Sequence, residues 1–310
     1  MSGWESWLVG TVSRALAFGT PLLWATLGEI YAERAGVVNL GVEGMMALGA
    51  FFGFAMAKVT GNPWVAIVLA ALAGGTASLL HAFLSVTLRA NQYVSGLALT
   101  MFGLGLSGLL GRGWTGQPLF HSLKSISIPG LSHIPYIGPM FFQKQSVLLY
   151  IGVLLALAMW FILFHTRWGL AIRAVGESPA TADAMGINVF AVRYLCVFIG
   201  GLLAGVAGGF LSVEYRPAWT EGMTAGMGWI AIALTIFVAW NPLQALGGAF
   251  LFGALYHLSY RLQQYVSPEL LKTLPYVAAI LVLSLTATGA ARRRRGAPAA
   301  LGIPYVRGER

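Results

Sequence analysis

The chain has 310 residues, of which 57% are hydrophobic and only 9% are charged, and its formal net charge is +9. Soluble domains carry about 25% charged residues, so this composition excludes a soluble enzyme or binding domain and predicts an integral membrane protein. The basic residues lie beside apolar segments, as the positive-inside rule describes, and therefore do not indicate nucleic-acid binding. The single cysteine, Cys196, lies in an apolar run, so no disulfide framework is expected.

Apolar segments that could span a membrane recur along the chain, since a tilted helix needs about 20 residues to cross the hydrocarbon. They lie at residues 8–28, 45–57, 63–88, 93–111, 146–164, 192–213, 229–240, 243–260 and 271–287. Residues 1–20 lack the basic start and small-residue cleavage site of a signal peptide. The sequence predicts an all-α polytopic membrane protein with about nine transmembrane helices, in a range of eight to ten.

Residues 29–44 set polar side chains beside apolar sequence and include glycines. Irregular backbone at membrane depth is tolerated only where it lines a cavity or is buried in protein, so we expect a broken or re-entrant second helix; an ordinary loop is the alternative. Asn39 and Glu43 are four apart and would share one helix face. Either they line a solute path, or they bond to Arg34 or to the backbone and hold the broken helix together.

Small and weakly polar residues mark two later spans. Ser95 and Thr100 in the fourth span either hydrogen-bond one helix to another or face a solute, and the sequence favours neither role. His81 in the third span is expected to be a packing residue with satisfied ring nitrogens. The glycines of the sixth span predict a close-packing face, because no strand precedes them as a phosphate-binding loop requires. They are Gly200, Gly201, Gly205, Gly208 and Gly209.

The segments between spans carry the topological signals. Residues 112–145, rich in Gly, Pro and Ser, are expected outside the cell, because the charged segment 167–188 lies one span later and must face the opposite side. Four consecutive arginines at 292–295 follow the last span and predict a cytoplasmic tail over residues 289–310. Trp219 and Glu221 lie in or beside a short polar loop and are candidates for the external mouth of a solute path.

Residues 167–188 are too charged to be a lipid-embedded helix and too patterned to be a plain linker. Ser178 is a plausible N-cap and Pro179 then occupies the first helical position. Gly186 supplies a C-terminal stop. The pattern predicts a short helix on a water-facing surface, where it either docks into a partner or is an ordinary interfacial helix.

Several ordered segments carry a family resemblance. The run GLAIRAVGESP at 169–179, with Ala182 and Gly186-Ile187, resembles the coupling segment of ABC importer permeases, in the binding-protein-dependent family that includes branched-chain amino acid and ribose importers. ERAGVVNLGVEG, YVSGLALT and the stretch from GMTAG to WNP resemble its nucleoside-type branch. The resemblance covers roughly residues 21–285 and departs from the family pattern at Met227 and Val238, which leaves the solute open.

The resemblance implies a single transmembrane permease domain over residues 1–310, in the cell inner membrane, that moves a small polar solute by alternating access. A nucleoside is the expected solute, and sugars or branched-chain amino acids are the alternative solutes. An ion-coupled secondary transporter is the alternative class of protein. The implied partners are a cytoplasmic ATPase subunit, a second permease subunit forming a heterodimer, an extracytoplasmic substrate-binding lipoprotein and membrane lipid. The implied ATPase-coupling residues are Arg173, Gly176, Glu177, Pro179, Ala182 and Gly186. The implied substrate-path residues are Asn39, Glu43, Ser95, Thr100, Trp219 and Glu221.

The sequence contains no pattern for chemistry of its own. There is no Gly-x-x-x-x-Gly-Lys-Ser/Thr loop for ATP hydrolysis, no His-Glu-x-x-His or Cys-x-x-Cys metal pattern and no Gly-x-Ser-x-Gly nucleophile elbow. An intramembrane enzyme would need a nucleophile with a base, or a metal cluster. A secondary transporter would need ionisable residues within spans, and the central spans carry almost none. We therefore expect no catalytic residue, metal site or cofactor.

Overall fold

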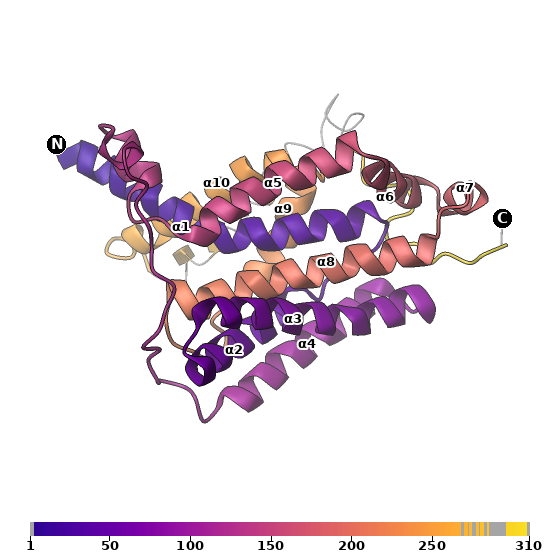
Figure 1. Cartoon of the computed structure of the whole chain (residues 1–310), viewed down its shortest axis with the longest axis horizontal. Coiled ribbons are helices and arrows are strands. Elements are labelled where there is room, and N and C mark those ends of the chain that lie inside the picture. The colour runs from indigo at the N-terminus through magenta and orange to yellow at the C-terminus, as the bar shows by residue number, and fades with distance from the viewer. Residues whose placement is uncertain are drawn as a thin grey trace.

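The computed structural model describes residues 3–267, 270–271, 273–274, 277–278, 280–281, 284 and 296–308 (Figure 1). Across these residues the regular elements are helices, joined by loops that contain two isolated β-bridges. The α-helices are α1 (Gly3–Arg34), α2 (Val42–Thr60), α3 (Pro63–Ala82), α4 (Gln92–Gly111), α5 (Val147–His165), α6 (Arg167–Glu177), α7 (Pro179–Ala184), α8 (Val189–Phe210), α9 (Met227–Phe237) and α10 (Pro242–Leu262). Short π- or 3-10 turns are η1 (Phe83–Thr87), η2 (Leu131–His133), η3 (Gly138–Phe142) and η4 (Leu211–Tyr215).

The described helices confirm a polytopic membrane protein. Six are long and apolar enough to cross a bilayer: Trp7–Arg34, Val42–Thr60, Pro63–Thr87, Gln92–Gly111, Val147–His165 and Val189–Tyr215. The predicted seventh span corresponds to α9, an apolar helix of only 11 residues, and the eighth to α10, which has the length but not the apolar composition of this set. Most of the predicted ninth span and the four arginines at 292–295 lie outside the described residues. The count of nine is therefore not established.

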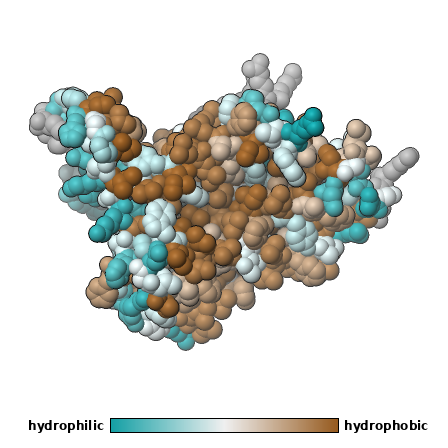
Figure 2. Space-filling view, in the orientation of Figure 1, coloured by the Kyte–Doolittle hydropathy of each residue, from teal (hydrophilic) through white to brown (hydrophobic). Residues whose placement is uncertain are grey.

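The long axis of the molecule is the direction of the spanning helices. In Figure 1, α1 and α8 run along this axis, with the N-terminus at one end and α6, α7 and the C-terminus at the other. Figure 2 shows hydrophobic side chains over the middle of the molecule and hydrophilic side chains gathered toward these two ends. An apolar belt between two polar ends is the surface that a bilayer requires.

Helix α8 lies at the centre and packs against α1, α2 and α3. A Cβ atom added at Gly208 would lie 1.9 Å from the carbonyl oxygen of Met46 in α2. One added at Gly205 would lie 2.2 Å from the carbonyl oxygen of Ala70 in α3. Only glycine allows backbones to approach so closely. The predicted close-packing face of this span is confirmed.

The end of α1 differs from the expectation. The predicted first span stops at residue 28, but α1 continues to Arg34 with Glu29 and Glu33 buried inside it. The helix ends at Gly36, which adopts a φ of 85° and whose N–H donates to the Glu33 carbonyl oxygen at 2.9 Å. Glutamate is a good helix former, and each of these carboxylates accepts one hydrogen bond, Glu29 from the Asn39 N–H and Glu33 from the Trp240 indole. These two residues add two ionisable groups to the first span.

The irregular backbone predicted to break the second helix instead precedes it. Residues 35–41 are irregular and mostly buried between α1 and α2, and α2 is continuous from Val42. Burial in protein satisfies the condition on which irregular backbone is tolerated at membrane depth. The prediction of unusual backbone near Asn39 is therefore confirmed, whereas its placement within the second helix is wrong.

The long segment 112–145 lies over the end of the molecule that holds the N-terminus. The Leu119 N–H donates to the Pro217 carbonyl oxygen at 2.9 Å, next to a bridge between Pro118 and Ala218. The Tyr136 hydroxyl donates to a Glu5 carboxylate oxygen at 3.0 Å. This hydrogen bond and the charge of Glu5 raise the pKa of the tyrosine. The segment is thus folded onto the polar loop that follows α8.

Candidate coupling and translocation sites

The charged segment 167–188 forms two helices, whereas the sequence predicted one. The additional helix is α6, and Thr166 caps it by accepting a hydrogen bond from the Gly169 N–H at 3.2 Å. Ile172 and Val175 are buried on its inner face. Polar and apolar residues alternate here at helical spacing, so the amphipathic period was a readable signal. Charge density had pointed to a loop, but an interfacial helix tolerates charge on its water-facing side.

The shorter helix α7 follows the predicted pattern closely. Ser178 is the N-cap residue and Pro179 occupies the first turn, although the serine hydroxyl contacts the Thr181 hydroxyl at 2.7 Å rather than a backbone N–H. Gly186 ends the helix with a φ of 84°. The N–H of Ile187 then donates to the Ala182 carbonyl oxygen at 3.0 Å, which is the six-to-one bond of a Schellman motif. Met185, at the end of the helix, is 78% exposed.

The end of α6 is pressed against the end of α1. A Cβ atom at Gly176 would lie 2.1 Å from the Arg34 carbonyl oxygen, so only glycine fits this contact. Arg34 in turn donates from Nη2 to the carbonyl oxygen of Ala239 and from Nε to that of Trp240, both at 3.1 Å. The α6–α7 unit is therefore fixed to the bundle at a defined point, while most of α7 projects beyond it.

The remaining predicted coupling residues lie around the same point. Ala182 is buried in a small apolar cluster with Val175 and Val189. The Arg173 guanidinium lies 5.5 Å from the centroid of the Phe164 ring. Glu177 is exposed at the end of α6. The structure thus brings all six predicted coupling residues together at one end of the molecule.

Glu43 joins the start of α2 to the start of α9. Its carboxylate accepts hydrogen bonds from the Thr224 hydroxyl at 2.5 Å and from the N–H groups of Gly226 at 2.9 Å and Gly228 at 2.7 Å. Asn39 is fully buried, and its side-chain oxygen accepts from the Gly41 N–H at 3.0 Å. Both side chains therefore serve the backbone of irregular segments, which corresponds to the second of the two roles considered for them.

The polar residues of α4 complete this buried network. Ser95 contacts His81 Nδ1 at 2.8 Å, and His81 Nε2 lies 3.0 Å from the Val38 carbonyl oxygen. The Thr100 hydroxyl donates to the Leu40 carbonyl oxygen at 2.8 Å. The expected role of His81 as a satisfied packing residue is confirmed. Both α4 residues hold the irregular segment 35–41 in place between helices.

Trp219 and Glu221, though close in sequence, occupy different environments. The Trp219 indole is buried against Gly111, where an added Cβ would lie 2.2 Å from the ring, and it packs edge-on against Phe51 at 6.0 Å. Glu221 is exposed and lines a cavity of about 240 Å³ at the same end of the molecule as residues 112–145. Aromatic and polar side chains share the wall of this cavity: Phe18, Tyr215, Tyr256, Tyr260, Arg216 and Thr220.

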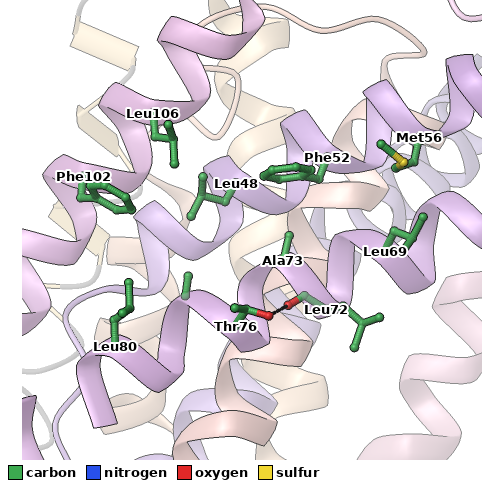
Figure 3. A pocket seen from close by; sticks show the side chains of 11 residues that line it. Leu48, Phe52, Met56, Leu69, Leu72, Ala73, Thr76, Leu80, Phe102 and Leu106 are labelled. Carbon is green, nitrogen blue, oxygen red and sulfur yellow. Dashed lines mark hydrogen bonds between the residues drawn. The ribbon is translucent and has the colours of Figure 1, made fainter. Parts of the chain in front are cut away.

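A larger cavity of about 530 Å³ lies between α2, α3 and α4 (Figure 3). Phe52 and Met56 of α2, Leu69 of α3 and Phe102 of α4 point toward it. Its lining is almost entirely apolar, and the Thr76 hydroxyl is engaged by donating to the Leu72 carbonyl oxygen at 2.7 Å. An apolar groove on membrane-spanning helices suits hydrocarbon chains better than a polar solute.

Three buried ionisable residues were not among the predicted site residues. Glu29 accepts a hydrogen bond from the Asn39 N–H at 3.2 Å, and Glu33 accepts one from the Trp240 indole N–H. Arg193, in the second turn of α8, is 1% exposed. An ionisable residue in an apolar helix is a signal in itself, but the partners of Glu33 and Arg193 lie far away in sequence. In the described part of the chain, no group of His, Cys, Asp or Glu could hold a metal ion.

The arrangement defines a membrane transport protein: a bundle of apolar helices, tightly packed around α8, with an amphipathic two-helix segment projecting at one polar end. A family model described as "Branched-chain amino acid transport system / permease component" matches residues 11–283. The chain belongs to this family of ABC transporter permeases, and is therefore a multi-pass protein of the inner membrane.

Curated relatives extend over nearly the whole chain. It is 39% identical to the "Putative glucose ABC transporter permease protein TsgC13" of Haloferax volcanii, with 97% of this chain and 99% of that protein covered. It is 37% identical to the guanosine ABC transporter permease protein NupQ of Bacillus subtilis, with 96% and 97% covered. It is 36% identical to the nucleoside ABC transporter permease protein NupC of Lactococcus lactis, with 96% of each chain covered.

One solved structure has the same fold. It is described as an inward-facing conformation of a "putative metal-chelate type ABC transporter". The match covers 89% of this chain and 84% of that chain, with a TM-score of 0.53 and 14% sequence identity. At this identity the likeness concerns the fold alone. The six described helices that could cross a membrane agree with the family assignment.

Proposed function

We propose that this chain is the permease subunit of an ATP-driven importer for nucleosides. The observation that carries the proposal is its similarity to two relatives named for guanosine and nucleoside transport, 37% and 36% identical over 96% of the chain. The chain itself would provide no catalysis, and ATP hydrolysis would be carried out by a separate cytoplasmic subunit. A second permease subunit, forming a heterodimer, and an extracytoplasmic substrate-binding lipoprotein would complete the transporter.

A sugar importer is the second candidate, because the relative named for glucose is 39% identical over 97% of the chain. Uptake measured with the complete transporter separates the two. We expect ATP-dependent uptake of radiolabelled guanosine, reduced by an excess of unlabelled adenosine or uridine and unaffected by glucose. Uptake of glucose without uptake of any nucleoside would contradict the proposal in favour of the second candidate.

The segment 167–188 is proposed as the coupling device, and α7 as the part that docks on the ATPase. Three observations support this role. Helix α7 projects from the bundle and exposes Met185. Helix α6 connects it to the bundle through the tight contact of Gly176 with Arg34. Arg34 continues that connection to the end of α9, so a displacement of α7 has a direct route to spanning helices.

Topology and domain organisation follow from this assignment. Residues 1–310 would form one permease domain, with the segment 167–188 and the tail 289–310 in the cytoplasm. The segment 112–145 would then lie outside the cell, since it covers the opposite end of the molecule (Figure 1). At that end it would be available to the substrate-binding lipoprotein.

The solute would enter through the cavity that Glu221 lines. A nucleoside presents a flat base and a hydroxyl-rich ribose, and this cavity offers aromatic side chains together with polar groups such as Thr220. The other predicted path residues support the scaffold of the path instead. Asn39, Glu43, Ser95 and Thr100 are each engaged in buried hydrogen bonds. Trp219 is packed behind the cavity wall.

A matched pair of variants tests the entrance. We expect Glu221→Gln to weaken uptake from low solute concentrations while leaving the folded complex intact, because the side chain is exposed. Gln263→Glu, a charge change of the same size at an exposed position outside segment 112–145, should leave uptake unchanged. Equal uptake in both variants and the parent would exclude Glu221 from the path.

A further inference from the structure

The segment 296–308 is bound to the coupling region by its own backbone. The Ala300 N–H donates to the Gly176 carbonyl oxygen at 2.9 Å. The Gly302 N–H donates to the Gly36 carbonyl oxygen at 3.2 Å. Gly176 lies in the last turn of α6, and Gly36 lies just after the end of α1. This short stretch of the tail therefore links the two helix ends whose contact fixes the coupling segment to the bundle.

Side chains of α6 and α7 hold the same segment from the other side. The Glu177 carboxylate accepts a hydrogen bond from the Ala299 N–H at 3.3 Å. The Arg307 guanidinium forms an ion pair with Asp183 of α7 at 2.9 Å. This ion pair is solvent-exposed, so alone it contributes little, but it adds to a set of contacts that spans the whole α6–α7 unit.

Apolar burial adds to these polar contacts. Tyr305 is buried in the cluster that contains Val175 of α6, Ala182 of α7 and Val189 of α8. Its ring lies 5.8 Å from the ring of Phe190. A buried aromatic side chain contributes far more to the free energy of association than an exposed ion pair. The tail is thus a packed part of the structure rather than a solvated basic extension.

Arg193 is the residue that joins this assembly to the central helix. It is buried in the second turn of α8. Its Nε donates to the Ala35 carbonyl oxygen at 3.2 Å, and its Nη1 donates to the Ile303 carbonyl oxygen at 3.1 Å. Its Nη2 is buried without a hydrogen-bond partner. Burying a cation costs free energy unless it is fully hydrogen-bonded, so the burial of this arginine lowers the stability of the fold. Its two bonds reach the end of α1 and the tail at once.

We propose that residues 296–308 are a clasp that sets the position of the coupling helices, and that Arg193 is a positioning residue which anchors this clasp to α8. The inference rests on the proposed coupling role of the segment 167–188. When the ATPase displaces α7, the clasp passes the displacement to the ends of α1 and α8, because it is bonded to both of them as well as to α6. Without the clasp, the contact of Gly176 with Arg34 would be the main rigid link between α6 and the end of α1.

The test uses the complete transporter in proteoliposomes and measures solute transported per ATP hydrolysed. Deletion of residues 296–310 and the variant Arg193→Met should each lower this ratio about fivefold or more, within the range of typical coupling factors. Arg193→Lys should recover part of the ratio, because it retains a donor but not the two-pronged geometry. Gly247→Ala in α10, whose added Cβ meets no atom within 4 Å, is the control and should retain the full ratio.

Hydrogen exchange supplies a readout that does not depend on transport. The clasp variants should exchange faster at the amides of α6 and α7, with unchanged protection in α2 and α3. If the deletion does not assemble, the pair Asp183→Arg and Arg307→Asp replaces it: each single change should lower the coupling ratio, and the double change should restore it. A full coupling ratio with unchanged exchange in Arg193→Met and in the charge-reversed singles would overturn the clasp.

The outcomes also separate the clasp from the coupling role itself. If Gly176→Ala uncouples the transporter and the clasp variants do not, the clasp is wrong and the coupling segment stands. If Gly176→Ala leaves coupling intact, the result contradicts the proposed coupling role of α6 and α7, on which the clasp depends.

Discussion

The Glu43 carboxylate accepts a hydrogen bond from the Gly228 N–H at 2.7 Å and so ties the first turn of α2 to the first turn of α9. The two helix starts lie 185 residues apart in the chain. A negative side chain is favourable at the N-terminus of a helix, where backbone N–H groups are unpaired. Glu43 therefore serves α9 as a cap supplied from another helix.

Replacing this cap should destabilise the protein. Glu43→Ala leaves the Gly226 and Gly228 N–H groups buried and unpaired, at a cost of roughly 1.5–3 kcal/mol for each hydrogen bond to a charged group. Glu43→Gln should cost less, because its amide oxygen still accepts one bond. The thermal midpoint of the purified transporter should fall in the order parent, glutamine, alanine. An alanine variant that melts with the parent would show that the cap is dispensable.

Asn39→Ala distinguishes a scaffold role from a solute-contacting role. Because Asn39 is buried and bonded to the Gly41 N–H, we expect a loss of about 1–3 kcal/mol in stability. Among nucleosides, the order of preference should be unchanged in the protein that remains folded. Competition assays with several unlabelled nucleosides check this order. A stable variant with a changed preference would place Asn39 in the solute path.

The glycine contacts of α8 should tolerate no side chain. Gly208→Ala would place a Cβ atom 1.9 Å from the Met46 carbonyl oxygen, and overpacking of this kind costs typically about 1–3 kcal/mol or more. We expect loss of monodisperse protein in size-exclusion chromatography. Gly247→Ala in α10 is the control, because no atom lies within 4 Å of its added Cβ. Similar behaviour of both variants would contradict the close-packing role.

Gly176→Ala tests coupling at its narrowest contact. The added methyl group would push the end of α6 away from the Arg34 carbonyl oxygen, which an added Cβ would approach to 2.1 Å. Solute-stimulated ATP hydrolysis should fall while membrane insertion is retained. Gly113→Ala is the control, since its added Cβ meets no atom within 4 Å. Normal transport by Gly176→Ala would remove this contact from the coupling route.

Thiol labelling tests the topology. In a Cys196→Ser background, Lys124→Cys should react with an impermeant reagent in intact cells, whereas Gly296→Cys should react only after the membrane is opened. Both residues are exposed in the folded chain, so burial does not limit labelling. The reverse pattern would invert the proposed orientation.

Features with a local physical cause could be predicted from the sequence. The Ser178-Pro179 start and Gly186 stop of α7 depend on neighbouring residues, and the glycine spacing of α8 depends on one helix alone. The family resemblance supplied all six predicted coupling residues, and the structure gathers them at one end. The amphipathic period of α6 also depends on that helix alone, although its charges favour a loop.

Features that depend on distant partners could not be predicted. Glu33 is buried in α1, and its carboxylate accepts a hydrogen bond from Trp240, far along the chain. Arg193 is tolerated in an apolar helix because carbonyl oxygens of Ala35 and Ile303 receive its N–H groups. The tail docks through backbone hydrogen bonds and through Tyr305, Arg307 and Arg193, whose partners lie far away in sequence. Each of these features depends on interactions between residues that are far apart in the sequence.

Where the glycines of α8 meet α2 and α3, backbone lies directly against backbone. At these contacts no side chain can change its rotamer to adjust the helix positions. Side chains normally act as a compliant layer that lets helices slide past one another in small steps. With carbonyl oxygens set directly against glycine backbone, that layer is missing. We therefore expect helices α2, α3 and α8 to move together as a single stiff block, with any bending at the edges of that block.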